Sequence, residues 1–201
     1  RDLIRVTETA MDMPTDTKVN EVRHGLAASE KPRAILRGRV APTLLRDELL
    51  CEIFGATASL IPDQPCMFAG DQTLTYSDVD EKATAMARGL VREGVRPGHV
   101  VGLWMPRGHE LLIAQIAIAK TGAAWLPFDA DAPLERIAVC LEDASARALL
   151  TSPVQAPGVE GRVNCDVLTE ANLIDKADAS VVSARALGAT PDHPAYMIYT
   201  S

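Results

Sequence analysis

Two hydroxyl residues, Thr200 and Ser201, follow directly after a short segment of mostly apolar and aromatic residues at positions 195–199. This composition predicts a buried strand that delivers the two hydroxyl groups at its carboxyl end. Such a strand commonly leads into a glycine-rich turn whose backbone N–H groups hold a phosphate. We therefore interpret Thr200 and Ser201 as the start of a phosphate-binding loop that continues beyond residue 201. The alternative is an ordinary strand terminus.

The cysteines and histidines carry no metal-binding pattern: Cys51, Cys66, Cys140, Cys165, His24, His99, His109 and His193. No Cys-x-x-Cys spacing occurs, so we expect reduced structural thiols, and the isolated histidines are expected to be surface or capping groups. Glu142 and Asp143 are adjacent on a predicted helix, so their side chains diverge and do not form a glycosidase-type dyad. No catalytic residue and no metal ligand is therefore predicted within the 201 residues.

Composition narrows the class of protein. Of the 201 residues, 47% are hydrophobic and 23% are charged, which is typical of a globular protein with a real core. The net charge of −7 argues against a nucleic-acid partner. The longest apolar stretch, residues 111–119, is too short to cross a membrane, and no signal peptide precedes it. We expect a cytoplasmic protein and, since the first residue is arginine, a piece of a longer polypeptide.

The chain divides near residue 42. Residues 1–42 hold few aromatic residues and no sustained periodicity, and they include a basic run at Lys31, Arg33, Arg37 and Arg39. Charge runs of this kind are usually solvated, which favours a leader or interdomain linker. The alternative is a segment that docks on a neighbouring domain. Residues 43–201 are expected to form the folded part.

Hydrophobic periodicity in the folded part predicts an α/β protein. A helix at 43–60 and a hairpin with strands at 66–69 and 73–76 come first, followed by a helix that begins with a capping box at Ser77 and Asp80. Strands at 100–104, 124–128 and 148–151 alternate with helices at 108–121 and 133–143. This alternation indicates parallel βαβαβ units. A strand at 163–167, a helical turn at 169–175 and the final strand at 195–199 are expected after them.

Four ordered segments together resemble a known family. They are residues 74–79 with 87–90, residues 119–129, residues 133–151 and residues 195–201. In this order they resemble the opening motifs of the adenylate-forming (AMP-binding) superfamily, most closely the amino-acid-activating adenylation domains of nonribosomal peptide synthetases. The resemblance covers about residue 44 to residue 201, and it identifies residues 43–201 as the leading portion of the large N-terminal subdomain.

The resemblance implies a parent ligase that uses ATP and Mg²⁺ to convert an amino acid into an aminoacyl adenylate and pyrophosphate. It further implies transfer of the acyl group to a phosphopantetheine thiol on a carrier domain, with a condensation domain as a possible upstream partner. Thr200 and Ser201 match the first residues of the family's phosphate loop. The substrate pocket and the catalytic lysine follow later in the family, so the isolated fragment is expected to be inactive.

Other matched residues are expected to be structural. Gly122 should end a helix, Asp129 should accept N–H groups near the next helix, and Tyr76 and Asp78 should support the hairpin end. Two alternatives remain open. One is a fragment of an acyl- or aryl-CoA ligase, which shares the last motif, and the other is a non-catalytic linker or interaction piece of a synthetase. A doubly wound dinucleotide-binding domain is disfavoured because no Gly-x-Gly-x-x-Gly follows a strand.

Overall fold

The computed structural model describes residues 46–174 and 180–199, and all of them except Arg46 belong to a unit that spans Asp47–Ser201. The predicted leader at 1–42 and the two residues Thr200 and Ser201 lie outside the described residues. The first helix, α3 (Leu50–Leu60), is shorter than predicted, because residues 46–49 are not helical. It begins where the Leu49 N–H donates to the Glu52 carboxylate at 2.7 Å, which satisfies a backbone group that precedes the first turn.

The predicted hairpin is present as β1 (Pro65–Ala69) and β2 (Gln72–Thr75), which pair antiparallel. It leads into α4 (Tyr76–Arg92), whose capping box is not the predicted one. The Thr75 hydroxyl accepts the Asp78 N–H at 3.1 Å, while the Asp78 carboxylate accepts the Thr75 N–H at 2.8 Å. Because β2 ends at Thr75, the first free N–H groups of the helix fall within reach of Thr75 and not of Ser77.

Replacement of Thr75 by alanine is expected to lower the free energy of unfolding by about 1 kcal/mol, because the hydroxyl that caps α4 is lost. Ser77→Ala is the matched control. The Ser77 hydroxyl makes one exposed contact, to Glu81 at 3.4 Å, so its removal should change stability by less than about 0.5 kcal/mol. Urea denaturation of both variants measures the difference, and equal effects would contradict the assignment of the cap.

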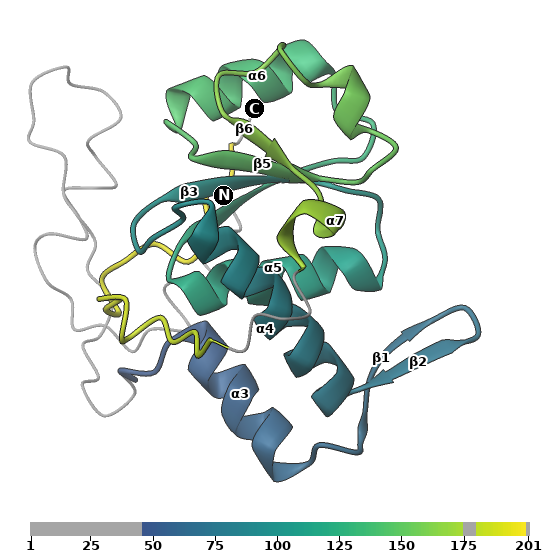
Figure 1. Cartoon of the computed structure of the whole chain (residues 1–201), viewed down its shortest axis with the longest axis vertical. Helices are drawn as coiled ribbons and strands as arrows, with labels where there is room; N and C mark the ends of the chain where they lie inside the picture. The colour runs from purple at the N-terminus through teal and green to yellow at the C-terminus, as the bar shows by residue number, and fades with distance from the viewer. Residues whose placement is uncertain (1–45, 175–179, 200–201) are drawn as a thin grey trace, which may run out of the picture. The chain divides into compact units, whose positions relative to one another are not determined.

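Four parallel strands form the sheet that lies between the helices (Figure 1). Their order is β4 (Ala124–Phe128), β3 (Val100–Trp104), β5 (Ala148–Thr151) and β6 (Asp166–Leu168). The helix α5 (His109–Thr121) joins β3 to β4, and α6 (Leu134–Asp143) joins β4 to β5. The predicted strands at 100–104, 124–128 and 148–151 are therefore confirmed, and they pair in parallel as expected.

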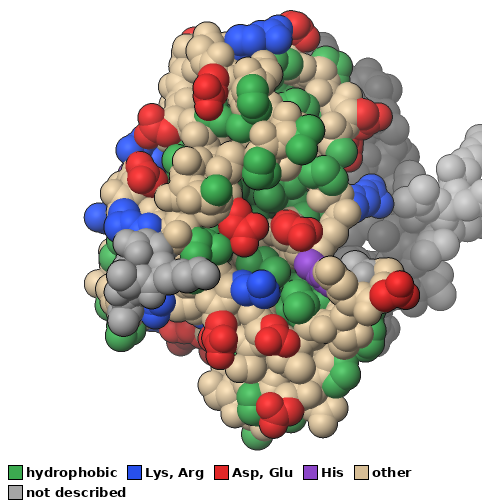
Figure 2. All heavy atoms as spheres, turned by 45° about the vertical axis from the view of Figure 1, so that its right-hand side comes forward, with side chains coloured by type: hydrophobic (Ala, Val, Ile, Leu, Met, Phe, Trp, Pro, Cys, Tyr) green, Lys and Arg blue, Asp and Glu red, His purple; other side chains and the backbone are tan. Residues whose placement is uncertain are grey.

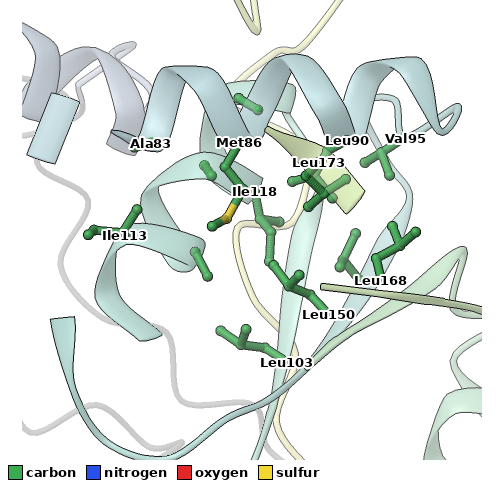
Figure 3. Close-up of a cluster of buried hydrophobic side chains, with 14 of the residues drawn as sticks. Ala83, Met86, Leu90, Val95, Leu103, Ile113, Ile118, Leu150, Leu168 and Leu173 are labelled. Carbon is green, nitrogen blue, oxygen red and sulfur yellow. The ribbon is translucent and has the colours of Figure 1, made fainter. Parts of the chain in front are cut away.

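The two faces of the sheet are covered by different helices. Alternate residues of β3 point to opposite faces, as in any strand: Val101 and Leu103 pack against α4 and α5, while Val100 packs on the side of α6. Figure 3 shows the larger cluster, in which side chains of α4 and α5 meet side chains of β3 and β5. The core is thus split by the sheet into two layers, which is why both faces of these strands are apolar.

Two late elements match the predictions in part. The strand β6 begins three residues after the start of the strand predicted at 163–167 and ends one residue beyond it. The short helix α7 (Glu170–Leu173) forms the helical turn expected at 169–175, of which residue 175 is not described. The α7 turn packs against α4, where Leu173 is completely buried.

The prediction of a final strand at 195–199 is wrong, because these residues do not form a regular strand. Within the described residues it pairs with β4 at a single parallel bridge, between Trp125 and Tyr196. The Trp125 N–H donates to the Ala195 carbonyl at 3.2 Å, and the Met197 N–H donates to the Trp125 carbonyl at 3.0 Å. On this side of β4, the next residue whose backbone nitrogen faces the segment is Pro127, and proline has no N–H group to donate. Proline therefore interrupts the ladder after one bridge.

Candidate functional site

A cavity of about 540 Å³ lies at the carboxyl ends of β3 and β4. Its walls come from the residues after each strand, from the first half of α5, from α6 and from Ile198 and Tyr199. In parallel α/β sheets, ligands bind in the crevice outside the carboxyl ends of the strands, and typical ligand cavities measure roughly 300–1,000 Å³. Position and size therefore make this cavity the candidate site.

Charged side chains of both signs line the cavity: Arg107, Asp129, Asp131 and Arg136. Within residues 46–174 and 180–199, these four side chains have no hydrogen-bond or ion-pair partner. A guanidinium group without a partner presents a fork of N–H donors that matches phosphate or carboxylate oxygens. Figure 2 shows one face of the molecule, where hydrophobic side chains lie among acidic and basic ones. The cavity itself has apolar lining residues that include Met105, Leu111 and Phe128. The arrangement suits a ligand with anionic groups on a partly apolar body.

The segment that carries Tyr199 to the cavity is tied to α6. The Tyr199 hydroxyl donates to the Asp143 carboxylate, and it lies 3.5 Å from the carbonyl oxygen of Cys140. This hydrogen bond to Asp143, followed by desolvation, raises the pKa of Tyr199 to about 12, whereas an unperturbed tyrosine has a pKa of about 10. The phenol therefore stays protonated, and remains a donor, throughout the neutral range.

The predicted phosphate-binding residues, Thr200 and Ser201, follow Tyr199 in the sequence and lie outside the described residues. The cavity brings together residues that the sequence did not single out as a site, above all Arg107 and Arg136. One feature of the sequence could have indicated these two arginines. Both arginines occur within eight residues after the end of a predicted parallel strand, at the edge of the sheet where ligands bind.

The residues expected to be structural largely behave so. Gly122 adopts φ +78° at the carboxyl end of α5, where its N–H donates to the Ala119 carbonyl at 3.0 Å. Tyr76 packs its ring against Phe54, with ring centroids 5.9 Å apart. The acceptor at Asp129 is its backbone carbonyl oxygen, which receives the Ala132 N–H and the Trp104 indole N–H, each at 3.0 Å. The prediction that Asp129 itself supplies the acceptor is therefore wrong for its side chain: the carboxylate has no hydrogen-bond partner among the described residues and lines the cavity.

One histidine prediction is wrong. His109 is buried, with 6% of its surface exposed, and its Nε2 has no hydrogen-bond partner in the described part of the chain. It begins α5 one turn before Ile113, so it shares the face of that helix that packs on the core. His99 and His193 do cap turns, because their Nδ1 atoms accept the N–H groups of Arg96 and Thr190 at 3.3 and 3.1 Å. His24 is not described.

All four cysteines are free thiols, of which Cys140 is buried and the other three are half-buried. Burial raises the pKa of the Cys51 and Cys165 thiols, so both stay protonated near neutral pH. Among the described residues, no group of three His, Cys, Asp or Glu side chains is arranged to hold a metal ion. None of the helices found there combines the length and the apolar character that a membrane crossing requires.

The sequence profile of one family, described as AMP-binding enzyme, matches residues 54–201. The chain belongs to the AMP-binding enzyme family. The matched region includes the whole sheet, all the residues that line the cavity and the segment that ends in Thr200 and Ser201. The predicted membership of the adenylate-forming superfamily is thereby confirmed.

The proteins similar to this chain include a named synthetase. Delta-poly-L-ornithine synthetase of Acinetobacter baumannii (strain AB307-0294) is 46% identical over 167 residues, which are 83% of this chain and 12% of that protein. The chain therefore spans about an eighth of the length of that relative.

The solved structures that share the fold include those of FmoA3 and NpsA. The nonribosomal peptide synthetase FmoA3 is 34% identical, with a TM-score of 0.70 over 78% of this chain and 16% of its own, and it was also solved with AMPPNP and with alpha-methyl-L-serine-AMP. The N-terminal subdomain of NpsA from Klebsiella oxytoca gives a TM-score of 0.66 at 23% identity, over 78% of this chain and 40% of its own. NpsA also occurs in an artificial adenylation–PCP fusion, NpsA-ThdA, at 25% identity and a TM-score of 0.61, over 69% of this chain and 26% of its own. The predicted α/β fold of an adenylation-domain N-terminal subdomain is confirmed.

Proposed function

We propose that residues 43–201 are the leading part of an amino-acid-activating adenylation domain of a nonribosomal peptide synthetase. The match of the AMP-binding family to residues 54–201 carries the proposal. The cavity at the carboxyl ends of β3 and β4 supports it, because Tyr199 lines this cavity and is followed by the two hydroxyl residues of the proposed phosphate loop. The adenylate bound to FmoA3 favours an amino acid over a simple aryl or acyl acid as substrate.

The proposed reaction has two steps. In the first, a carboxylate oxygen of the amino acid attacks the α-phosphorus of ATP, the bond to the β-phosphate oxygen breaks, and pyrophosphate leaves. In the second, a phosphopantetheine thiol on a carrier domain gives up its proton and attacks the acyl carbon, so that a thioester forms and AMP leaves. Thr200 and Ser201 would donate hydrogen bonds to phosphate oxygens and stabilise the charge that develops during the first step.

The described residues do not supply a protein cage for Mg²⁺, because no group of three candidate ligands lies together among them. Magnesium, when bound with ATP, would screen the phosphate charge. Arg107 and Arg136 are available in the cavity for anionic groups of the substrates. We further propose a cytoplasmic location, a linker role for residues 1–42, and partnership with a carrier domain and an upstream condensation domain.

ATP–pyrophosphate exchange tests the function. The complete polypeptide that contains this chain should exchange labelled pyrophosphate into ATP only when its amino acid is present, and a panel of amino acids, aryl acids and fatty acids identifies the substrate class. The 201-residue chain alone should show no exchange. Ser201→Ala in the complete polypeptide should lower kcat/KM at least about tenfold, because a donor to the reacting phosphate is removed.

Thr73→Ala is the matched control for Ser201→Ala. Thr73 is an exposed hydroxyl residue of β2, outside the cavity, so its replacement should leave exchange unchanged. Exchange that is independent of any amino acid, or that responds only to aryl or fatty acids, would reject the amino-acid-activating function. Amino-acid-dependent exchange by the 201-residue chain would reject the prediction that this part is inactive by itself.

A further inference from the structure

The chain that enters the proposed phosphate loop is held at two places. One is the bridge to β4 at Trp125, where the ring of Trp125 also stacks on that of Tyr196 with centroids 5.7 Å apart. The other is the hydrogen bond from the Tyr199 hydroxyl to Asp143, the last residue of α6. Between them, Pro127 withholds the N–H that would continue the ladder.

The hydrogen bond between Tyr199 and Asp143 therefore positions the segment beyond the point where its main-chain pairing with β4 ends. A regular strand positions each residue by main-chain hydrogen bonds, but residues 198 and 199 lie beyond the single bridge. Met197 and Tyr199 pack instead on the cluster of buried side chains beneath α6, and the Tyr199 hydroxyl reaches the carboxyl end of that helix. A side-chain contact across 56 residues of sequence thus determines where the main chain stands immediately before Thr200.

We propose that Tyr199 and Asp143 form a positioning pair that fixes the main chain at Tyr199 against α6, immediately before the proposed phosphate-binding loop. The inference rests on the proposed function, since it assigns the pair to the binding of ATP phosphate by Thr200 and Ser201. This role requires no contact of either side chain with substrate, although Tyr199 also lines the cavity. The pair acts through the main chain, and its loss should weaken ATP binding more than amino-acid binding.

The kinetic test uses the complete polypeptide and varies ATP and the amino acid separately in the exchange assay. Tyr199→Phe keeps the ring and removes only the hydroxyl, and it should raise KM for ATP about fivefold, the effect of roughly one hydrogen bond, while KM for the amino acid stays within twofold. Asp143→Ala should have the same effect, and the double variant should be no worse than either single one. Asp143→Asn keeps an acceptor oxygen and should restore much of the affinity for ATP.

Matched controls exist for both members. Tyr196 lies three positions before Tyr199 on the same segment, and Tyr196→Phe removes a hydroxyl that has no partner in the described residues. Glu142→Gln changes the carboxylate of α6 that neighbours Asp143. Both should keep KM for ATP at the wild-type value. If the wild-type polypeptide is active and Tyr199→Phe leaves KM for ATP unchanged, or raises both KM values equally, the positioning role is wrong. A wild-type polypeptide without amino-acid-dependent exchange would instead reject the proposed function, and this role with it.

A second measurement needs no activity. The chain has three tyrosines, and their ionisation can be followed by ultraviolet absorbance immediately after a pH jump, while the chain is still folded. One tyrosine should titrate near pKa 12, and this step should vanish in Tyr199→Phe and shift toward the ordinary value of about 10 in Asp143→Ala. If no wild-type tyrosine titrates above about 11, which is midway between the bonded and ordinary values, the hydrogen bond on which the pair depends is absent.

Discussion

Leu103→Ala is expected to lower the free energy of unfolding by about 2–5 kcal/mol, the largest stability loss that we predict for a single side chain of this protein. Leu103 is fully buried in β3, on the face that packs against α4 and α5 (Figure 3). Its removal from the centre of the sheet leaves a cavity that neighbouring side chains on rigid elements fill only in part. The cost therefore includes lost packing as well as lost burial.

Urea denaturation of the 201-residue chain, followed by circular dichroism, measures the effect. The matched control is Leu60→Ala, the same substitution at a residue of α3 with 80% of its surface exposed, and it should change stability by less than about 0.5 kcal/mol. Similar losses for both variants would show that β3 does not form the centre of the core.

Gly89→Ala should destabilise the chain by about 1–3 kcal/mol, although alanine is the better helix former. A Cβ at residue 89 of α4 would lie 2.3 Å from the carbonyl oxygen of Leu173 and 2.6 Å from its Cα. Both are main-chain atoms of α7, so the clash is relieved only when the helix α7 moves away from α4. The steric cost exceeds the gain of roughly 1 kcal/mol from helix propensity.

Gly55→Ala provides the comparison, because Gly55 lies within α3 and a Cβ there would meet no atom within 4 Å. This variant should be more stable than the wild type by about 0.5–1 kcal/mol. Thermal and urea unfolding of the two variants would therefore give opposite signs. Stabilisation by Gly89→Ala would show that α7 does not pack against α4 as closely as the structure has it.

Much of the fold could be predicted because its signals are local. The apolar runs at 100–104, 124–128 and 148–151 coincide with β3, β4 and β5 to the residue, since strands buried on both faces of a parallel sheet are apolar throughout. The helix α5 starts one residue later than predicted and ends as predicted at Thr121. Glycine at residue 122 marks that end because it alone accepts the positive φ without strain.

The predictions failed where two local signals compete, or where a residue far away in the sequence determines the local structure. Thr75 and Ser77 are both plausible caps, and only the end of β2 selects Thr75. Residues 195–199 have the composition of a strand, yet a proline on the neighbouring strand stops their pairing. His109 was expected to be a surface or capping group, but the face of α5 that it shares with Ile113 is buried.

The sequence by itself indicated the family, through the resemblance of four ordered segments to its motifs, and it predicted the order of the elements from periodicity along one stretch of chain. It also places the two hydroxyl residues directly after position 199. Only the tertiary structure decided which charged residues meet in the cavity, why residue 89 must be glycine, and that Tyr199 is bound to Asp143. Those features depend on residues that are far apart in sequence and adjacent in space. Local patterns carry no information about such contacts, since they arise only when the sheet and its helices pack together.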